Sequence, residues 1–357
     1  MTGQTFDVAV IGGGVAGVAA AAELARDASV VLIEREDQPG YHASGRSAAL
    51  FAPNYGSGPM QELTLQSADF FTAPPEGFGT LLSPRGFVFI AREDQLASLP
   101  KSLPQVSGAE LEAEVPLIRK GYAAGAAWNE GASDIDVHAL MQGYLRLAKA
   151  RGAVVMTGAE VRGLSPGWQV ETSKGSLRAR VVVNAAGAWV DEVAKLAGVA
   201  PLGFTPMRRS ACTVAAPEGL DIGKVPMIVD ADEEFYLKPE AGRLMISLAD
   251  ETPSPPCDAQ PEELDLAVGV DRAMQACDVQ VRRLESRWAG LRTFAPDRAP
   301  VVGFDPAAEG FFWMGGHGGT GVQTAPAMGR LVADLVRGDA PEDAALAAEI
   351  APGRFGC

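Results

Sequence analysis

The sequence predicts an α/β protein in which a Rossmann-like domain is combined with a discontinuous, β-rich domain. Two observations predict this fold class. A β-α-β pattern with a glycine-rich turn opens the chain, and similar strand-and-helix units recur near its middle and its end. The stretches between these units consist of short apolar runs broken by proline and glycine. We expect one domain from residues 1–80, 136–203 and 300–357, and a second from residues 81–135 and 204–299.

The first unit is a strand at residues 6–11, a helix at 15–26 and a strand at 29–33, the order of a β-α-β fold. A helix at 60–71 follows. Further along the chain, apolar patterns predict strands at 86–91, 153–157, 168–172, 181–184, 235–237, 244–247 and 311–314. They also predict helices at 136–151, 189–196 and 261–276, and a last helix that ends near residue 337.

The composition is that of a globular protein with a large core, because 47% of its 357 residues are hydrophobic. The formal net charge of −15 argues against a nucleic-acid partner, whose phosphates would be repelled. Four scattered cysteines and three distant histidines suit neither a disulfide framework nor a metal site. The uncharged run at 8–22 is shorter than the ~20 residues that span a bilayer and follows no basic residue. We therefore expect a cytoplasmic protein without an integral membrane segment or a bound metal.

The turn after the first strand reads Gly12-Gly13-Gly14-Val15-Ala16-Gly17 and matches G-x-G-x-x-G. Gly12 would make the tight turn, Gly14 would let the backbone approach a pyrophosphate, and Gly17 would let the helix pack closely on the strand. Glu34 closes the second strand twenty residues after Gly14, where it can accept hydrogen bonds from ribose hydroxyls. The pattern predicts a dinucleotide site, against the alternative of a plain strand-turn-helix, and does not distinguish NAD from FAD.

Two later segments favour a flavin. The strand at 181–184 runs into the small residues 185–188, which admit a cofactor beside the backbone. The turn at 315–321 contains five glycines and opens a helix, whose N-terminus would stabilise the negative charge that a flavin ring develops on reduction. Helix capping is the alternative explanation, although one cap needs fewer glycines. His317 in this turn either tunes the ring or fills space.

Several motifs, in order along the chain, resemble the D-amino-acid oxidase superfamily of FAD-dependent oxidoreductases. Besides G-x-G-x-x-G and Glu34, they are the stretches at 41–49, 183–189, 288–293 and 318–323. The similarity is greatest to bacterial D-amino-acid dehydrogenases of the D-arginine type and covers nearly the whole chain. It implies a Rossmann-like FAD-binding domain, a β-rich substrate-binding domain, and an active site between them at the flavin.

The resemblance also implies which residues hold the FAD. We expect the FAD to bind without a covalent link, because no cysteine lies in these segments. The cofactor-binding residues would be Gly12, Gly14, Gly17, Glu34, Arg35, Ser44, Arg46, Ser47, Ala48, Ala186, Gly187, Trp189, Gly318, Gly319, Thr320, Gly321 and Gln323.

On the substrate side, the resemblance implies that Arg292 holds the carboxylate of an amino acid. The chemistry agrees, because a carboxylate that leaves water needs a charge-assisted and preferably bidentate partner. A buried structural ion pair is the alternative role for this residue. Arg208 and Arg209 are adjacent on an expected strand and point to opposite faces, so at most one enters the site. The resemblance adds as catalytic residues Tyr236, Arg209, Tyr55 and Gln323, and as pocket residues Leu50, Phe87, Gly290 and Ala48.

The resemblance implies FAD-dependent oxidation of the Cα–N bond of a D-amino acid to an imino acid, by hydride transfer to the flavin N5. No acidic residue occurs at 50–52 or 86–89, whereas D-arginine-type relatives hold an acid at the place of Phe87. We therefore expect a substrate with an apolar or small side chain. The alternatives are oxidation of glycine or sarcosine, an NAD-dependent dehydrogenase, and a flavoprotein without turnover. The electron acceptor, oxygen or a quinone, is open at this point.

Overall fold

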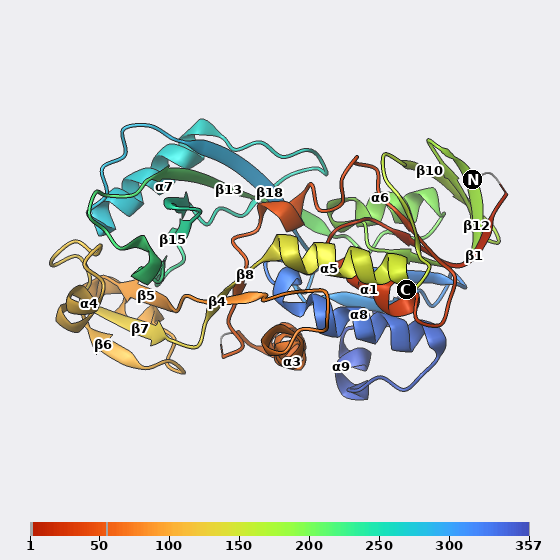
Figure 1. Cartoon of the computed structure of the whole chain (residues 1–357), viewed down its shortest axis with the longest axis horizontal. Coiled ribbons are helices and arrows are strands. Elements are labelled where there is room, and N and C mark those ends of the chain that lie inside the picture. The colour runs from red at the N-terminus through yellow and green to blue at the C-terminus, as the bar shows by residue number, and fades with distance from the viewer. Residues whose placement is uncertain (1–2, 55, 357) are drawn as a thin grey trace.

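The structure is a computed structural model that describes residues 3–54 and 56–356. In this part of the chain, an eight-stranded sheet and a nine-stranded sheet are joined by a three-stranded sheet (Figure 1). The first and last segments of the chain, red and dark blue, lie together around the eight-stranded sheet (Figure 1). The nine-stranded sheet forms the opposite end of the elongated molecule (Figure 1).

The eight-stranded sheet contains the parallel strands of the Rossmann-like fold. Its central order is β9-β2-β1-β12-β20, with all five strands parallel. β19 pairs antiparallel with β20, and the β10-β11 hairpin pairs antiparallel with the start of β12. The strands are β1 (Thr5–Ile11), β2 (Val30–Ile33), β9 (Val154–Met156), β10 (Val161–Ser165), β11 (Gln169–Thr172), β12 (Gly175–Asn184), β19 (Val301–Phe304) and β20 (Phe311–Gly315).

Helices cover both faces of this sheet. α1 (Val15–Leu24), α5 (Val137–Ala150) and α8 (Gly321–Arg337) share one apolar core, and α6 (Val190–Leu196) packs on the other face. α1 contacts both α5 and α8, and every residue from 15 to 22 is buried. The alanines, valines and glycine of α1 follow from this position, because small side chains let three helices approach one another closely.

The nine-stranded sheet has the order β17-β13-β16-β15-β14-β5-β7-β6, and β18 pairs with β13 along most of its length. Only the β14–β5 pair is parallel among the described strands of this sheet. Helices α4 (Gly108–Glu114) and α7 (Glu263–Ala276) share an apolar cluster with it. The strands are β5 (Phe87–Ala91), β6 (Gln105–Ser107), β7 (Gly125–Asn129), β13 (Thr205–Ala215), β14 (Met227–Asp230), β15 (Tyr236–Glu240), β16 (Arg243–Ser247), β17 (Thr252–Pro253) and β18 (Ser286–Phe294).

The small sheet, β3-β8-β4, connects the two larger ones: β3 (Leu50–Phe51), β8 (Ser133–Ile135) and β4 (Leu82–Pro84). The buried Lys238 of β15 fixes it in place, because its Nζ donates to the Ala48 carbonyl at 2.8 Å and pairs with Asp134 at 2.9 Å. The remaining described helices are α2 (Gly58–Gln66), α3 (Ala68–Thr72), α9 (Ala344–Glu349), η1 (Ala43–Arg46), η2 (Glu93–Ser98), η3 (Gly187–Trp189), η4 (Ile222–Lys224) and η5 (Pro352–Phe355).

The structure confirms the mixed α/β fold with a Rossmann-like parallel sheet and a separate β-rich sheet. The helix predicted at 60–71 is divided at Ser67, whose hydroxyl donates to the Leu63 carbonyl at 2.8 Å and accepts from the Ala327 amide at 3.1 Å. The strands of the two large sheets come from the two predicted sets of segments, while the boundaries of whole domains stay a prediction. Within residues 3–54 and 56–356, every helix is too short or too polar to cross a membrane.

Gly17 tests the close packing of α1 on β1, because a Cβ at this position would collide with the Gly12 carbonyl oxygen. We expect Gly17→Ala to lower the free energy of unfolding by about 1–3 kcal/mol, the usual cost of overpacking, and to weaken cofactor binding. Urea denaturation would measure the free energy of unfolding. Gly353→Ala is the matched control, since its Cβ would meet no atom within 4 Å. Equal stability of the two variants would contradict the packing argument.

Candidate active site

A cavity of about 520 Å³, here called the large chamber, lies at the carboxyl ends of the parallel strands. Its wall includes Gly12 after β1, Glu34 after β2, and residues 185–189 after β12. A second cavity of about 130 Å³, the small chamber, adjoins it, and eight residues line both: Gly14, Ala43, Ser44, Arg46, Ala185, Gly187, Gly290 and Leu291. Carboxyl ends of parallel strands are where ligands bind in open α/β sheets.

The glycine turn brings backbone to the edge of both chambers. Gly12 has φ 108°, and a Cβ there would collide with the Ala185 carbonyl. Gly14 lines both chambers, and its Cβ would meet only Ser44 Oγ, at 3.3 Å. The Val15 amide is capped by Ser44 Oγ at 2.9 Å, whereas the Gly14 and Ala16 amides make no hydrogen bond within the described residues. The start of α1 therefore offers free N–H groups to an anion.

Glu34 is oriented by the backbone around it. Its Oε2 accepts from the Gly13 amide at 2.7 Å and its Oε1 from the Glu36 amide at 2.8 Å. The side chain is buried and lines the large chamber. Each carboxylate oxygen keeps acceptor capacity beyond one hydrogen bond. Glu34 can therefore accept from ribose hydroxyls while it stays fixed.

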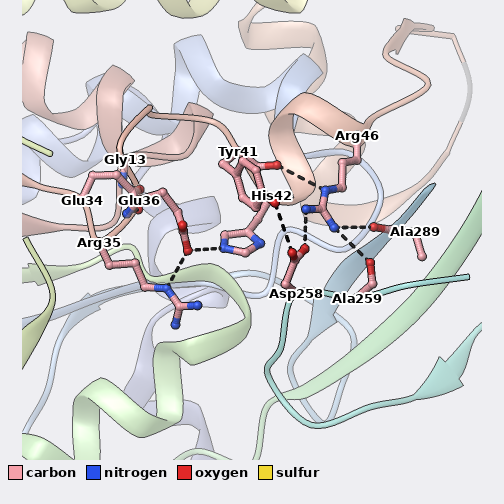
Figure 2. Close-up of polar contacts among 10 residues, drawn as sticks. All are labelled: Gly13, Glu34, Arg35, Glu36, Tyr41, His42, Arg46, Asp258, Ala259 and Ala289. Atoms are coloured by element: carbon pink, nitrogen blue, oxygen red, sulfur yellow. Dashed lines mark hydrogen bonds and ion pairs between the residues drawn. The ribbon is translucent and has the colours of Figure 1, made fainter. Parts of the chain in front are cut away.

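A row of polar contacts continues from Glu34 along the large chamber (Figure 2). Glu36 Oε1 lies 2.9 Å from both Arg35 Nε and His42 Nε2. Although burial acts to raise it, hydrogen bonds from Arg35 and His42 hold the pKa of Glu36 below its usual value. The Arg35 guanidinium stacks on Trp189, with Cζ 4.1 Å from the ring centroid. These contacts fix the wall of the chamber without filling it.

Arg46 joins the two large sheets, a role that the sequence did not predict. Its guanidinium pairs with Asp258 at 2.5 Å and donates to the carbonyls of Ala259 at 3.1 Å and Ala289 at 2.8 Å (Figure 2). We had expected Arg46 to bind the cofactor. It lines both chambers, but its charge is neutralised by Asp258, because the segment around Asp258 folds back onto η1. The hydrogen bond from Arg46 also lowers the pKa of Asp258.

One face of the β13–β18 pair forms part of the small chamber. Arg209 lies opposite Gly290 and Met207 opposite Arg292 in the antiparallel register, so Arg209, Gly290 and Arg292 share that face. Arg209 donates to the Asp250 carbonyl at 2.7 Å and pairs with Glu251 at 3.3 Å. Arg208 points to the other face and pairs with Glu262 and Asp265 of the α7 region, as the alternation of a strand requires.

Arg292 is a cation without a partner in the described part of the chain, where no carboxylate lies within 4.0 Å of its nitrogens and no hydrogen bond reaches it. Burial, together with the nearby charge of Arg209, lowers the pKa of Arg292 from its usual value. A Cβ at Gly319 would lie 3.0 Å from Arg292 Nη1, so the glycine turn leaves room for this guanidinium. A guanidinium that is partly withdrawn from water and has no partner is costly, and an anionic ligand would satisfy it.

His317 also lines the small chamber. Both of its ring nitrogens are buried and lack a hydrogen-bond partner among the described residues. Burial lowers the pKa of His317 to about 4. The imidazole is therefore neutral at physiological pH and is not a general acid there.

Most of the predicted site residues do line the cavity. In the large chamber these are Gly12, Gly14, Glu34, Arg35, Ser44, Arg46, Ala186, Gly187 and Trp189. In the small chamber they are Gly14, Ser44, Arg46, Ser47, Ala48, Gly187, Arg209, Tyr236, Gly290, Arg292, Gly318, Gly319 and Gly321. Gly17 lies behind the turn, where it packs on Gly12. Tyr55 lies outside the described residues.

Besides Gly17, four described residues of the predicted site line neither chamber. Phe87 and Leu50 pack in an apolar cluster with Phe89 and Ala52, outside both chambers, so their role in a substrate pocket stays a prediction. The reason for this position is that β5 lies two strands beyond β15 in the sheet, away from the β13–β18 face. Gln323 accepts from the Ala52 amide at 3.2 Å, and Thr320 donates to the His317 carbonyl at 3.1 Å. Both support the loops around the site.

The sequence also missed residues that the fold brings to the cavity. Ala211 and Met245 line the small chamber, and Cys257 lines the large one. The expectation of a non-covalent FAD rested on the absence of a cysteine from the predicted cofactor-binding segments. Because Cys257 lines the large chamber, that reason no longer holds. No local signal marks these residues, because they come from β13, β16 and the loop after β17, which reach the cavity only through the sheet order.

Comparison with known proteins agrees with this geometry. The family model described as FAD dependent oxidoreductase, DAO, matches residues 7–335. The chain belongs to this family. It is 27% identical over 366 residues to a glycine oxidase of Geobacillus kaustophilus, covering 93% of each chain. It is 28% identical over 360 residues to a glycine oxidase of Pseudomonas aeruginosa, covering 94% of this chain and 95% of the other. The crystal structure of L-proline dehydrogenase from P. horikoshii superposes with a TM-score of 0.86 at 22% identity, covering 100% and 99% of the two chains.

This DAO-family protein is therefore an FAD-dependent oxidoreductase. The cavity fits FAD, because the Gly14 backbone leaves open space, the first amides of α1 are free, and Glu34 faces the large chamber. The narrower resemblance to D-arginine-type enzymes is not supported by these relatives, which are glycine oxidases and a proline dehydrogenase.

The buried neutral state of His317 predicts a pH effect on stability. Its pKa is about 4 when folded and 6.5 ordinarily, so the unfolded chain binds the proton first as pH falls. The stability that the neutral imidazole contributes is complete above pH 6.5 and is lost between pH 6.5 and about 4. Between pH 7 and pH 5, we expect the free energy of unfolding of the parent apoprotein to fall by about 2 kcal/mol more than that of the His317→Gln apoprotein. Urea unfolding at the two pH values would measure both. Identical losses would contradict a buried neutral His317.

Proposed function

We propose that this protein oxidises the Cα–N bond of a small amino acid of the glycine or N-methylglycine type. The substrate loses a hydride from Cα and a proton from nitrogen, and the product is an imino acid. Bound FAD supplies the acceptor of that hydride. The observation that carries the proposal is the unpaired guanidinium of Arg292 in a chamber of about 130 Å³.

Arg292 would bind the substrate carboxylate. A guanidinium offers two parallel N–H donors to a carboxylate, and both charges leave water together. Gly319 keeps the space beside Nη1 free. Tyr236 lines the same chamber from β15 and can donate its hydroxyl to the bound carboxylate. The carboxylate would thereby be fixed at one end of the chamber, with Cα at a set distance from it.

The amine would react in its neutral form. Arg209 and Arg292 both line the small chamber, and no Asp or Glu is among its described lining residues. An ammonium group would find no carboxylate partner among these residues, so the lining lowers the pKa of the bound amine. A neutral amine needs no strong base for hydride loss. This explains why a neutral His317 is compatible with the reaction.

The lining also limits the substrate side chain. Without a described carboxylate in the small chamber, a basic side chain finds no counter-charge there. The chamber volume of about 130 Å³ is small. These properties favour glycine or sarcosine as the substrate. The relatives from G. kaustophilus and P. aeruginosa, which are named glycine oxidases, support the same choice.

A small apolar D-amino acid is the second candidate. The apolar residues Ala48, Ala211 and Met245 line the small chamber and can contact a short side chain. The 41–49 and 288–293 motifs, which resemble D-amino-acid dehydrogenases, favour it.

Flavin reduction tests the proposal. We expect anaerobic glycine or sarcosine to bleach the flavin absorbance of the purified protein faster than D-alanine, and D-arginine to bleach it slowly or not at all. Faster bleaching by D-alanine would favour the second candidate. No bleaching by any amino acid would overturn the proposed reaction.

Arg292→Lys tests carboxylate binding. Loss of the paired N–H donors should raise KM for the amino acid about 10- to 100-fold, because charge-assisted hydrogen bonds contribute about 1.5–3 kcal/mol. Arg287→Lys is the matched control on the same strand, since Arg287 is exposed and pairs only weakly with Glu263 at 3.6 Å. Steady-state kinetics would measure both variants. An unchanged KM in Arg292→Lys would assign the carboxylate to another residue.

A further inference from the structure

The segment from Ser254 to Gln260, here called the strap, crosses from the nine-stranded sheet to the cofactor cavity. It connects β17 to the start of α7. Cys257 and Ala259 line the large chamber, although the glycine motif that defines this chamber belongs to the other sheet. The strap is therefore a piece of the β-rich part of the chain that helps to enclose the cofactor site.

Few contacts hold the strap down. Ala259 is buried beside Ala188, Ala289 and Leu291, and most of the strap is exposed. Pro255 and Pro256 have no amide hydrogen to donate, so they cannot tie the strap to a strand. The polar attachment to the cofactor side is concentrated at Asp258 and the neighbouring Ala259 carbonyl.

Asp258 bonds to two residues of the loop around η1. Its Oδ1 lies 2.5 Å from Arg46 Nη2, and its Oδ2 accepts from the Tyr41 hydroxyl at 3.1 Å (Figure 2). Arg46 also donates to the Ala259 carbonyl at 3.1 Å, so one guanidinium holds two consecutive strap residues. Figure 2 shows Tyr41, Asp258 and Arg46 converging from the two parts of the chain.

We propose that Asp258 is a positioning residue of the cofactor site, which closes the strap over the large chamber through Arg46 and Tyr41 and thereby slows the release of FAD. Without the carboxylate, the polar attachment of the strap to η1 is reduced to the Ala259 carbonyl, and Arg46 loses its counter-charge beside the chamber. The strap can then lift from η1. This role concerns cofactor retention and is independent of which amino acid the enzyme oxidises.

The first test is the rate at which FAD leaves the holoenzyme, followed by the rise in flavin fluorescence after dilution. We expect Asp258→Ala to release FAD about 3- to 30-fold faster, the range expected for a hydrogen-bonded ion pair that is partly exposed. Tyr41→Phe removes only the hydroxyl contact and should give a smaller increase. Glu263→Gln is the matched control, because it removes an exposed carboxylate just beyond the strap that pairs with Arg287 at 3.6 Å.

Cys257 provides a second measurement that does not depend on activity. In a Cys357→Ser background it is the exposed thiol, because Cys212 and Cys277 are buried and burial raises the pKa of their thiols to about 11 and about 12. With FAD saturating, a maleimide should label Cys257 faster in Asp258→Ala than in the parent or in Glu263→Gln.

Faster FAD release and faster Cys257 labelling in Asp258→Ala, with the control unchanged, would support the proposal. Release within twofold of the parent in both Asp258→Ala and Tyr41→Phe would overturn it. An equal increase in Glu263→Gln would also overturn it, because the effect would then follow from general loss of surface charge.

Discussion

The close approach of α1 to the ends of β1 and β12 is the constraint on which the rest of the structure depends. Gly12 touches the Ala185 carbonyl, and Gly17 packs against the Gly12 carbonyl, so neither position has space for a Cβ. This approach leaves the Gly14 and Ala16 amides free at the helix start and brings Glu34 to the same edge. The large chamber exists because backbone, and not side chains, occupies this edge of the sheet.

The second requirement is that the nine-stranded sheet meets this edge in one position. Arg46 fixes the meeting point, because it bonds to Ala289 of β18 and to Asp258 and Ala259 of the strap. Lys238 does the same for the small sheet through the Ala48 carbonyl and Asp134. Both cations bridge parts of the chain that lie more than a hundred residues apart. Each of the two cations is held by acceptors from separate segments, so together they specify one arrangement of these segments.

Charge is distributed unevenly in this molecule. The whole chain has a formal net charge of −15, yet Arg209 and Arg292 line a small chamber whose described residues include no acid. Arg208, one residue away, is neutralised on the opposite face by Glu262 and Asp265. The alternation of a single strand thus directs Arg208 to the α7 region and Arg209 to the chamber face, where Arg209 pairs with Glu251. Arg292 has no partner among the described residues, and the carboxylate of the proposed substrate would supply one.

The sequence by itself determined the parallel sheet and the dinucleotide turn, because each depends on local features: hydrophobic period and glycine spacing. The family resemblance of the 288–293 segment singled out Arg292 as the candidate carboxylate ligand. The sequence also predicted that Arg208 and Arg209 diverge, since alternation along a strand is local. Tertiary structure decided the rest. Phe87 lies outside the small chamber because of the strand order, and Cys257 and Ala259 reach the large chamber through a strap that no local pattern marks. Which distant segments meet is set by packing of whole sheets, and only the folded chain shows it.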